Sequence, residues 1–155
     1  MSRVDHSFIV QENKMIFGSL TAGTDLIEGI LEECRKHNVS SGMVTCIGSL
    51  KKVGYVLFQT KDGVPSGYGK DIHISQPVEL IQCTGFICVD DQQKLDLHLH
   101  GLVVEENGKI SGGHFLRGKN PTLITVEFSI IYGGDIKAVR TFDENLKFKV
   151  INYSN

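Results

Sequence analysis

Residues 95–100, which read LDLHLH, alternate strictly between apolar and polar side chains and are soon followed by Asn107-Gly108. Alternation with a period of two is typical of a β-strand that is buried on one face, and it places Asp96, His98 and His100 together on the other face. Asn-Gly between two extended runs is the strongest short-range signal for a β-hairpin. The sequence therefore predicts two antiparallel strands joined by a tight turn.

A third histidine, His114, follows Gly112-Gly113 on the returning strand. Register decides whether it joins the other two, because a shift of one residue moves every side chain of a strand to the opposite face. A two-residue loop would place His114 opposite Gly101 and point its side chain away from His98 and His100. A three-residue loop that ends in a left-handed glycine, or a bulge at Gly112-Gly113, would turn His114 toward them.

Three imidazoles on one face would predict a metal site formed by His98, His100 and His114. Same-face neighbours lie about 7 Å apart at Cα, so their side chains can converge on an ion with metal–nitrogen distances of about 2.0–2.1 Å. Three histidine ligands leave a fourth position for water or substrate, which is typical of catalytic zinc sites. Nitrogen ligands also suit nickel, copper and iron, so we expect zinc or another divalent transition metal. The alternative is three ordinary strand histidines.

The length, net charge and apolar runs of the chain limit the classes of protein to which it can belong. With 155 residues, the chain has the length of one domain, which we place at residues 1–155. The net charge of −2 gives no general attraction to nucleic acid or anionic membranes, so DNA binding would need a local basic patch. No apolar run approaches the roughly 20 residues of a membrane span, and the polar start at residues 1–6 lacks the apolar core of a signal peptide. We expect a cytoplasmic protein without a membrane partner.

One helix and many strands are predicted. Thr24 or Asp25 can cap a helix whose apolar stripe includes Leu26 and Cys34, and Asn38 can end it. Residues 61–70 have the composition of a flexible loop, which could act as a lid or a partner contact. This content indicates an α+β fold, mainly antiparallel sheet with one principal helix near the N-terminus. Strands are expected near residues 8–10 and 15–17 as an opening hairpin, and near 43–47, 53–58, 78–89, 94–105, 109–116, 122–132 and 146–151.

Residues 122–131 also alternate and place Glu127 on a polar face. If that face adjoins the histidines, Glu127 could orient a ligand imidazole, bind the metal or accept a proton from metal-bound water. The alternative is a glutamate that faces solvent. The sequence contains neither a glycine-rich phosphate loop nor a Gly-x-Ser-x-Gly elbow, so nucleotide binding and serine hydrolase chemistry lack their usual motifs.

Six motifs follow one another in order along the chain: Gly23-Thr24-Asp25-Leu26, Gly48-Ser49-Leu50, Pro77-Val78-Glu79-Leu80-Ile81 with Gly85, His98-Leu99-His100, Gly112-Gly113-His114 and Thr125-Val126-Glu127. Together they resemble the PPC domain, the "plants and prokaryotes conserved" family, over residues 7–131. The resemblance implies an α+β domain that assembles as a homotrimer.

In bacterial and archaeal members of that family the matching histidines suggest a bound zinc, so the resemblance implies that His98, His100 and His114 are metal ligands. It also matches Glu127 to a glutamate that is characteristic of the prokaryotic motif. The family is often described as DNA-binding because plant members join this domain to AT-hook segments. The resemblance therefore implies a DNA-associated or regulatory role, although this chain contains no Arg-Gly-Arg-Pro hook.

A more distant likeness is to acetolactate decarboxylase, which also holds zinc with a His-x-His pair and a later histidine. There the metal polarises a keto-acid substrate and an arginine can position its carboxylate, a role for which Arg117 is the candidate here. This likeness keeps open a metal-dependent lyase or hydrolase that acts on a small carbonyl compound, with Glu127 handling protons. A metal that only holds the hairpin or a trimer interface together is a third possibility.

Overall fold

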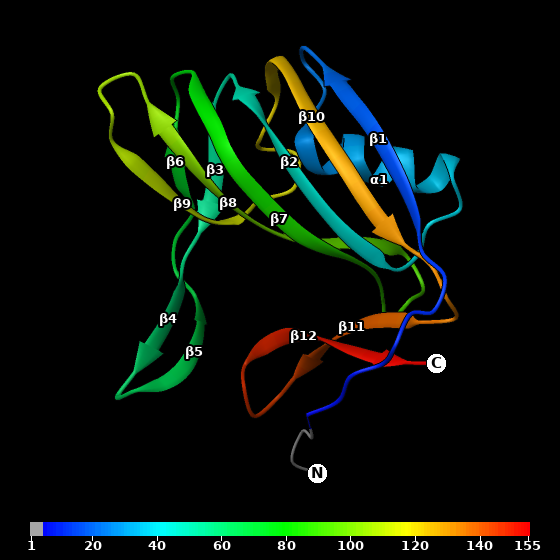
Figure 1. Cartoon of the computed structure of the whole chain (residues 1–155). Coiled ribbons are helices and arrows are strands. Elements are labelled where there is room, and N and C mark those ends of the chain that lie inside the picture. The colour runs from blue at the N-terminus through cyan, green and yellow to red at the C-terminus, as the bar shows by residue number, and fades with distance from the viewer. Residues whose placement is uncertain (1–4) are drawn as a thin grey trace.

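The computed structural model describes residues 5–155, so most of the polar start, residues 1–4, lies outside it. Within these residues the chain forms mainly antiparallel sheet with a single helix near the N-terminus, which confirms the predicted α+β class (Figure 1). The elements are β1 (Lys14–Thr21), α1 (Leu26–Lys36), β2 (Gly42–Leu50), β3 (Val53–Val56), β4 (Phe58–Lys61), β5 (Val64–Tyr68), β6 (Ile72–Ile74), β7 (Val78–Asp90), β8 (Leu95–Glu105), β9 (Ile110–Phe115), β10 (Thr122–Tyr132), β11 (Lys137–Asp143) and β12 (Phe148–Ser154).

Ten of the strands belong to one sheet, whose main path has the order β1-β10-β2-β7-β8-β9-β3-β6. All neighbours on this path are antiparallel. At the end of β7, β11 adds in parallel through Val139 opposite Val89 and Arg140 opposite Asp90, and β12 pairs with β11. The strands β4 and β5 form a separate hairpin, and Figure 1 shows both hairpins below the sheet.

The helix α1 begins where predicted because Asp25 caps it: its carboxylate accepts hydrogen bonds from the backbone N–H groups of Ile27 and Glu28 at 3.1 Å. Just beyond the helix, Asn38 takes a left-handed conformation with φ 55°. The apolar side of α1 covers one face of the sheet (Figure 1) and builds the main core with alternate strand residues, among them Val44, Cys46, Cys83, Leu99, Val126, Phe128 and Ile130.

The sheet face opposite α1 carries the remaining alternate side chains. Cross-strand pairing aligns them in rows that run across five or six strands. One row ends at His98 and contains Met15, Ile131, Met43 and Phe86, and the adjacent row consists of Phe17, Ser129, Thr45, Thr84, His100 and His114. The three histidines therefore lie side by side at one end of this face.

The predicted opening hairpin is wrong, because residues 8–10 form no strand and β1 pairs with β10 instead. The preceding segment packs against the C-terminal hairpin, where the backbone N–H of Tyr153 donates a hydrogen bond to His6 Nε2 at 3.0 Å. Residues 61–70 are also more ordered than predicted: Asp62 and Gly63 take left-handed conformations and turn β4 back into β5. Within the described residues, the helix is too short and too polar to cross a membrane.

Candidate metal centre

The loop between β8 and β9 has three residues, 106–108, which is the alternative that brings the histidines together. The N–H of Glu105 donates to the carbonyl of Lys109 at 2.9 Å, and Gly108 closes the turn with φ 84°. Pairing continues without a shift to His100 opposite His114. Residues that lie directly opposite each other point to the same face, so the left-handed glycine places His114 beside His100.

The three imidazoles converge. The Nε2 atoms of His98 and His100 are 3.1 Å apart, and one ring nitrogen from each of the three histidines lies within 4.8 Å of the others. A tetrahedral zinc ion with Zn–N distances of about 2.0–2.1 Å holds its nitrogen ligands about 3.3 Å apart. The His98–His100 pair already has about this spacing, and the nitrogen of His114 lies within 4.8 Å of both, so the cluster is close to the size that a metal needs.

Two glycines allow the strands around the cluster to approach closely. A Cβ atom on Gly112 would lie 2.0 Å from the carbonyl oxygen of Gly101 on β8, and one on Gly113 would lie 2.7 Å from the carbonyl oxygen of Val56 on β3. Backbone atoms cannot move aside as a flexible side chain can. The Gly112-Gly113 pair is therefore required by the packing of β9 between its neighbours, immediately before His114.

The surroundings keep the imidazoles neutral. Burial, and then the positive charge of Arg140, lower the pKa of His98 to about 4 and that of His114 to about 3. The same two causes lower the pKa of His100. Neutral imidazole is the form that binds a metal ion, so the site needs no deprotonation of histidine to accept one at neutral pH.

The histidines line a pocket of about 490 Å³ whose other walls are mainly apolar. The β4–β5 hairpin contributes Tyr68, whose hydroxyl lies 3.5 Å from His114 Nδ1, so part of the predicted loop reaches the site. On the other side, Phe148 of β12 packs edge-on against Tyr68 with ring centroids 4.9 Å apart. The remaining wall residues are Val56, Leu57, Phe58, Pro65, Gly113 and Lys149.

The two further residues that the sequence suggested do not touch the histidines in this chain. Glu127 lies on the same sheet face, but β2 and β7 separate its strand from β8, a distance of about 14 Å across the sheet. Its carboxylate accepts a hydrogen bond from Ser19 at 3.3 Å. Arg117 forms an ion pair with Glu28 of α1. Its Nε–H and one terminal N–H each donate a hydrogen bond to the carboxylate, the second at 3.0 Å.

Sequence reasoning missed Arg140 and Tyr68. Arg140 belongs to β11, which we did not predict, and one of its terminal nitrogens donates to Asp96 at 3.2 Å. Asp96 is the residue that precedes His98 on the histidine face, so the ion pair lies directly beside the cluster. The sequence of β11, KAVRTFD, contains no signal for this strand: burial alternates along it, with Ala138 and Arg140 both buried, but apolar and polar residues do not.

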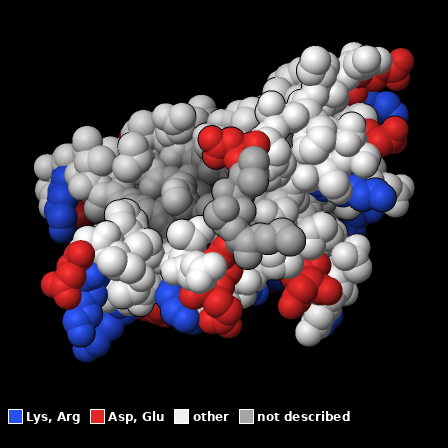
Figure 2. Space-filling view, turned by 90° about the horizontal axis from the view of Figure 1, so that it is seen from below, with Lys and Arg blue, Asp and Glu red and all other residues white. Residues whose placement is uncertain are grey.

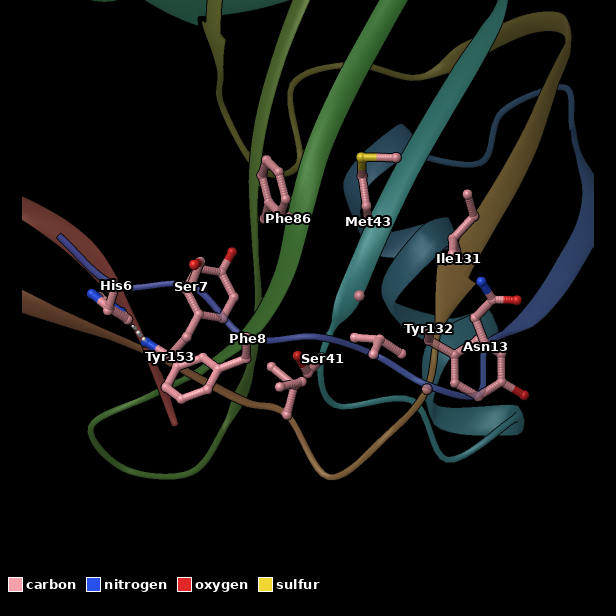
Figure 3. Close-up of a pocket in the computed structure, with 14 residues that line it drawn as sticks. His6, Ser7, Phe8, Asn13, Ser41, Met43, Phe86, Ile131, Tyr132 and Tyr153 are labelled. Carbon is pink, nitrogen blue, oxygen red and sulfur yellow. Dashed lines mark hydrogen bonds between the residues drawn. The ribbon is translucent and has the colours of Figure 1, made fainter. Parts of the chain in front are cut away.

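A second pocket, of about 440 Å³, lies between the N-terminal segment and the strands β2, β7 and β10 (Figure 3). Its walls are mostly apolar and include Phe8, Met43, Phe86 and Ile131. In the part of the chain that the structure describes, the three histidines are the one group of His, Cys, Asp or Glu side chains close enough to share an ion. The candidate metal centre is therefore the pocket at β8 and β9.

Comparison with solved structures shows the same fold in several proteins at low sequence identity. A metal-containing protein of Archaeoglobus fulgidus superposes with a TM-score of 0.76 at 18% identity, over 96% of this chain and 98% of that one. A plant- and prokaryote-conserved protein of Pyrococcus horikoshii gives 0.75 at 21% identity, over 96% and 97%. A Bacteroides thetaiotaomicron protein to which DNA binding is provisionally attributed gives 0.75 at 20%, over 89% and 91%.

Among curated proteins, no significant match is found. The model of the Plants and Prokaryotes Conserved (PCC) domain matches residues 9–132 of this chain, which is more than half of its length. The match spans the histidine strands and the helix, and it ends before β11. The chain therefore belongs to the Plants and Prokaryotes Conserved domain family, as its ordered motifs predicted.

Proposed function

We propose that His98, His100 and His114 bind one divalent metal ion, zinc being the first candidate, at the floor of a pocket that admits a small ligand. The observation that carries this proposal is the convergence of three ring nitrogens within 4.8 Å on a face where burial keeps the imidazoles neutral. The fold shared with an archaeal protein described as metal-containing supports it.

The pocket residues have distinct roles in this proposal. Tyr68 contacts Nδ1 of His114, and a partner at one ring nitrogen directs the metal to the other. A metal held by three neutral histidines supplies a Lewis acid with an open coordination position. The apolar walls exclude water from this position and contact the body of a ligand. Neither Glu127 nor Arg117 is needed for the metal to bind.

Elemental analysis tests the metal. Protein purified without chelator should contain about one equivalent of zinc, or of another divalent transition metal, per chain. The double variant His98→Ala, His114→Ala should lose it. The matched control is His37→Ala, His73→Ala, which removes two exposed histidines whose side chains lie near the carboxylates of Glu33 and Asp71. Wild-type protein that takes up no zinc, nickel, copper or iron when it is dialysed against each of these metals would overturn the proposal.

The protein is also proposed to act as a homotrimer. The sheet face opposite α1 exposes large apolar side chains on several strands, notably Phe17, which is 77% exposed, and Ile47, which is 57% exposed. Apolar groups spread over such a face are typical of a surface that binds another protein chain. The family resemblance supplies the trimeric state as the expectation.

DNA association is a second candidate, favoured by the structural relatives to which DNA binding is attributed. The chain itself carries a net charge of −2, and Figure 2 shows acidic and basic side chains interspersed on the face seen from below. Even non-specific binders usually reach dissociation constants of about 10⁻⁴–10⁻⁶ M. A DNA-binding protein should therefore shift duplex DNA in a gel at physiological salt, and no shift at tens of micromolar protein would exclude this role.

A further inference from the structure

Glu127 is an exposed carboxylate within an apolar part of the sheet face opposite α1. Ile47 lies directly opposite it on β2, and Phe17 belongs to the adjacent row on β1; both are exposed. In the part of the chain that the structure describes, the carboxylate accepts a hydrogen bond from Ser19, and no lysine or arginine pairs with it. Water stabilises this charge as long as the face stays exposed.

Assembly through this face would bury the charge of Glu127. A carboxylate that is buried without a positive partner strongly destabilises an interface. As the structure describes them, the row of Glu127 and the two rows that end at His98 and His114 contain no lysine or arginine. The imidazoles at the end of these rows are neutral, so the positive charge available on the rows is that of a metal bound to them. Charge complementarity therefore pairs Glu127 with a metal centre.

The metal centre has no carboxylate of its own chain to serve as this partner. Among the described residues, the group that could share an ion consists of the three histidines alone. Asp96, which precedes them on the same face, already pairs with Arg140. A divalent ion that is bound by three neutral imidazoles keeps its whole positive charge, which becomes the largest in the site. His100 is exposed, so another molecule can reach the cluster from solvent.

Three-fold symmetry would bring the carboxylate and the histidines together. A closed ring of three chains has a heterologous interface, in which one patch of a chain contacts a different patch of the next chain. Glu127 lies toward the β1 end of the sheet face and the histidines toward the β9 end, and Figure 1 shows β1 and β9 on opposite sides of the sheet. When three such faces surround a common axis, the β1 end of each face adjoins the β9 end of its neighbour.

We propose that, in the trimer, Glu127 of each protomer faces the metal centre of the next protomer and supplies the carboxylate that this site lacks. The inference rests on the proposed function, both the metal site and the trimer, and adds a residue to the site. The carboxylate lies beside the open coordination position, where it offsets the charge of the metal and accepts a hydrogen bond from a bound ligand. Ser19 holds it in place through its own hydrogen bond.

Zinc affinity, measured by competition with a chelator, tests the proposal. Glu127→Gln keeps the size of the side chain and the contact with Ser19 but removes the charge. It should bind zinc tenfold to hundredfold more weakly than wild type, the usual effect of losing a group that supports a metal site from outside its ligands. The control Glu32→Gln removes an exposed carboxylate from α1, on the other side of the sheet, and should bind zinc like wild type. A trimeric Glu127→Gln protein with wild-type zinc affinity would overturn the inference.

Mixed trimers show which chain supplies the carboxylate. Glu127→Gln and the double variant His98→Ala, His114→Ala are coexpressed with different affinity tags and purified through both tags, so that every trimer contains both variants. In each such ring, one intact set of histidines adjoins one intact Glu127 of the next chain, although neither variant has both. We therefore expect one high-affinity zinc per mixed trimer. Mixed trimers without high-affinity zinc would overturn the inference, because a carboxylate that acts within its own chain cannot restore the site.

The inference and the proposed function can fail separately. Wild-type protein that binds no divalent transition metal overturns the proposed function itself. Wild-type protein that binds zinc as a monomer retains the histidine site and overturns the role of Glu127. If Glu127→Gln does not assemble alone, its mixed trimers with the histidine variant still decide between the two arrangements.

Discussion

At the scale of single residues, the histidine cluster is set by its neighbours as much as by its own side chains. His98 and His114 have pKa values of about 4 and about 3 because burial disfavours the imidazolium, with Arg140 as the next cause. The ordinary value is 6.5. When folding lowers the pKa of a group, its contribution to the stability of the folded state is complete above the unfolded-state pKa. That contribution is lost as the pH falls toward the folded-state pKa.

The metal-free protein should therefore lose stability as the pH falls from about 6.5 toward 4. The unfolded chain takes up protons on these histidines in this window, whereas the folded chain does not. Chemical denaturation of chelator-treated protein at several pH values measures the effect. The variant His98→Gln, His114→Gln should show a shallower decline, since carboxylates titrate in both proteins. Equal pH dependence in the two would show that these histidines titrate normally.

Gly112 permits a test of close packing at the level of one carbon atom. In Gly112→Ala, the new Cβ would lie 2.0 Å from the Gly101 carbonyl oxygen, so β8 and β9 must separate. We expect the free energy of unfolding to fall by about 1–3 kcal/mol, the usual cost of overpacking, and the variant to lose its zinc. Gly108→Asn is the control, because nothing lies near its Cβ and asparagine tolerates the left-handed conformation. An alanine variant of wild-type stability and zinc content would contradict this account.

At the scale of elements, the register of the β8–β9 hairpin depends on a loop of three residues, one more than the shortest Asn-Gly turn has. Deletion of Lys109 should keep the three-residue loop but pair Glu105 with Ile110, which places His114 opposite Gly101 and turns its side chain to the core face. We expect loss of zinc and of several kcal/mol of stability, measured by elemental analysis and denaturation. Lys109→Ala keeps the register and should retain the metal. Full zinc content after the deletion would show that β9 can absorb the change through a bulge.

The sequence predicted those elements whose signals are local. The alternation of β8, the Asn107-Gly108 turn and the Asp25 cap each depend on residues a few positions apart, and all three are confirmed. The register of the hairpin stayed open because Asn-Gly suits two-residue and three-residue loops alike. Only hydrogen bonds such as that between Glu105 and Lys109 decide it.

The errors concern pairings between distant segments. Arg140 reaches Asp96, beside the histidines, only because β11 adds in parallel to β7, which lies about fifty positions earlier in the chain. No turn motif in the sequence indicates such a pairing. The prediction for the N-terminal segment was wrong for the same reason, since β1 pairs with β10 rather than with residues 8–10. Residues 61–70 have a loop-like composition, yet the left-handed pair at Asp62 and Gly63 makes them a hairpin.

At the scale of the whole molecule, the sheet face opposite α1 carries the prediction about assembly. If Phe17 and Ile47 are covered by a neighbouring protomer, then Phe17→Glu or Ile47→Glu should convert the trimer to monomer, because a buried unpaired charge is costly. Light scattering after gel filtration should show three times 17.1 kDa for wild type and 17.1 kDa for the variants.

Val64→Glu is the control for this experiment, since Val64 is exposed on the separate β4–β5 hairpin. It should leave the trimer intact. Thermal unfolding of each variant separates dissociation from misfolding, because the side chains of Phe17 and Ile47 lie outside the main core. A monomeric wild-type protein, or glutamate variants that remain trimeric, would remove the case for this face as the interface.

The C-terminal hairpin joins the sheet through only two residue pairs, between β11 and the end of β7. The strands that hold the histidines are fixed by long ladders on both sides of β8. We therefore expect an exchange of residues 137–154 between relatives to change the pocket wall formed by Phe148 and Lys149 while the three histidines stay in place. An engineer could therefore reshape this pocket by grafting one terminal hairpin, without mutating any of the three histidines.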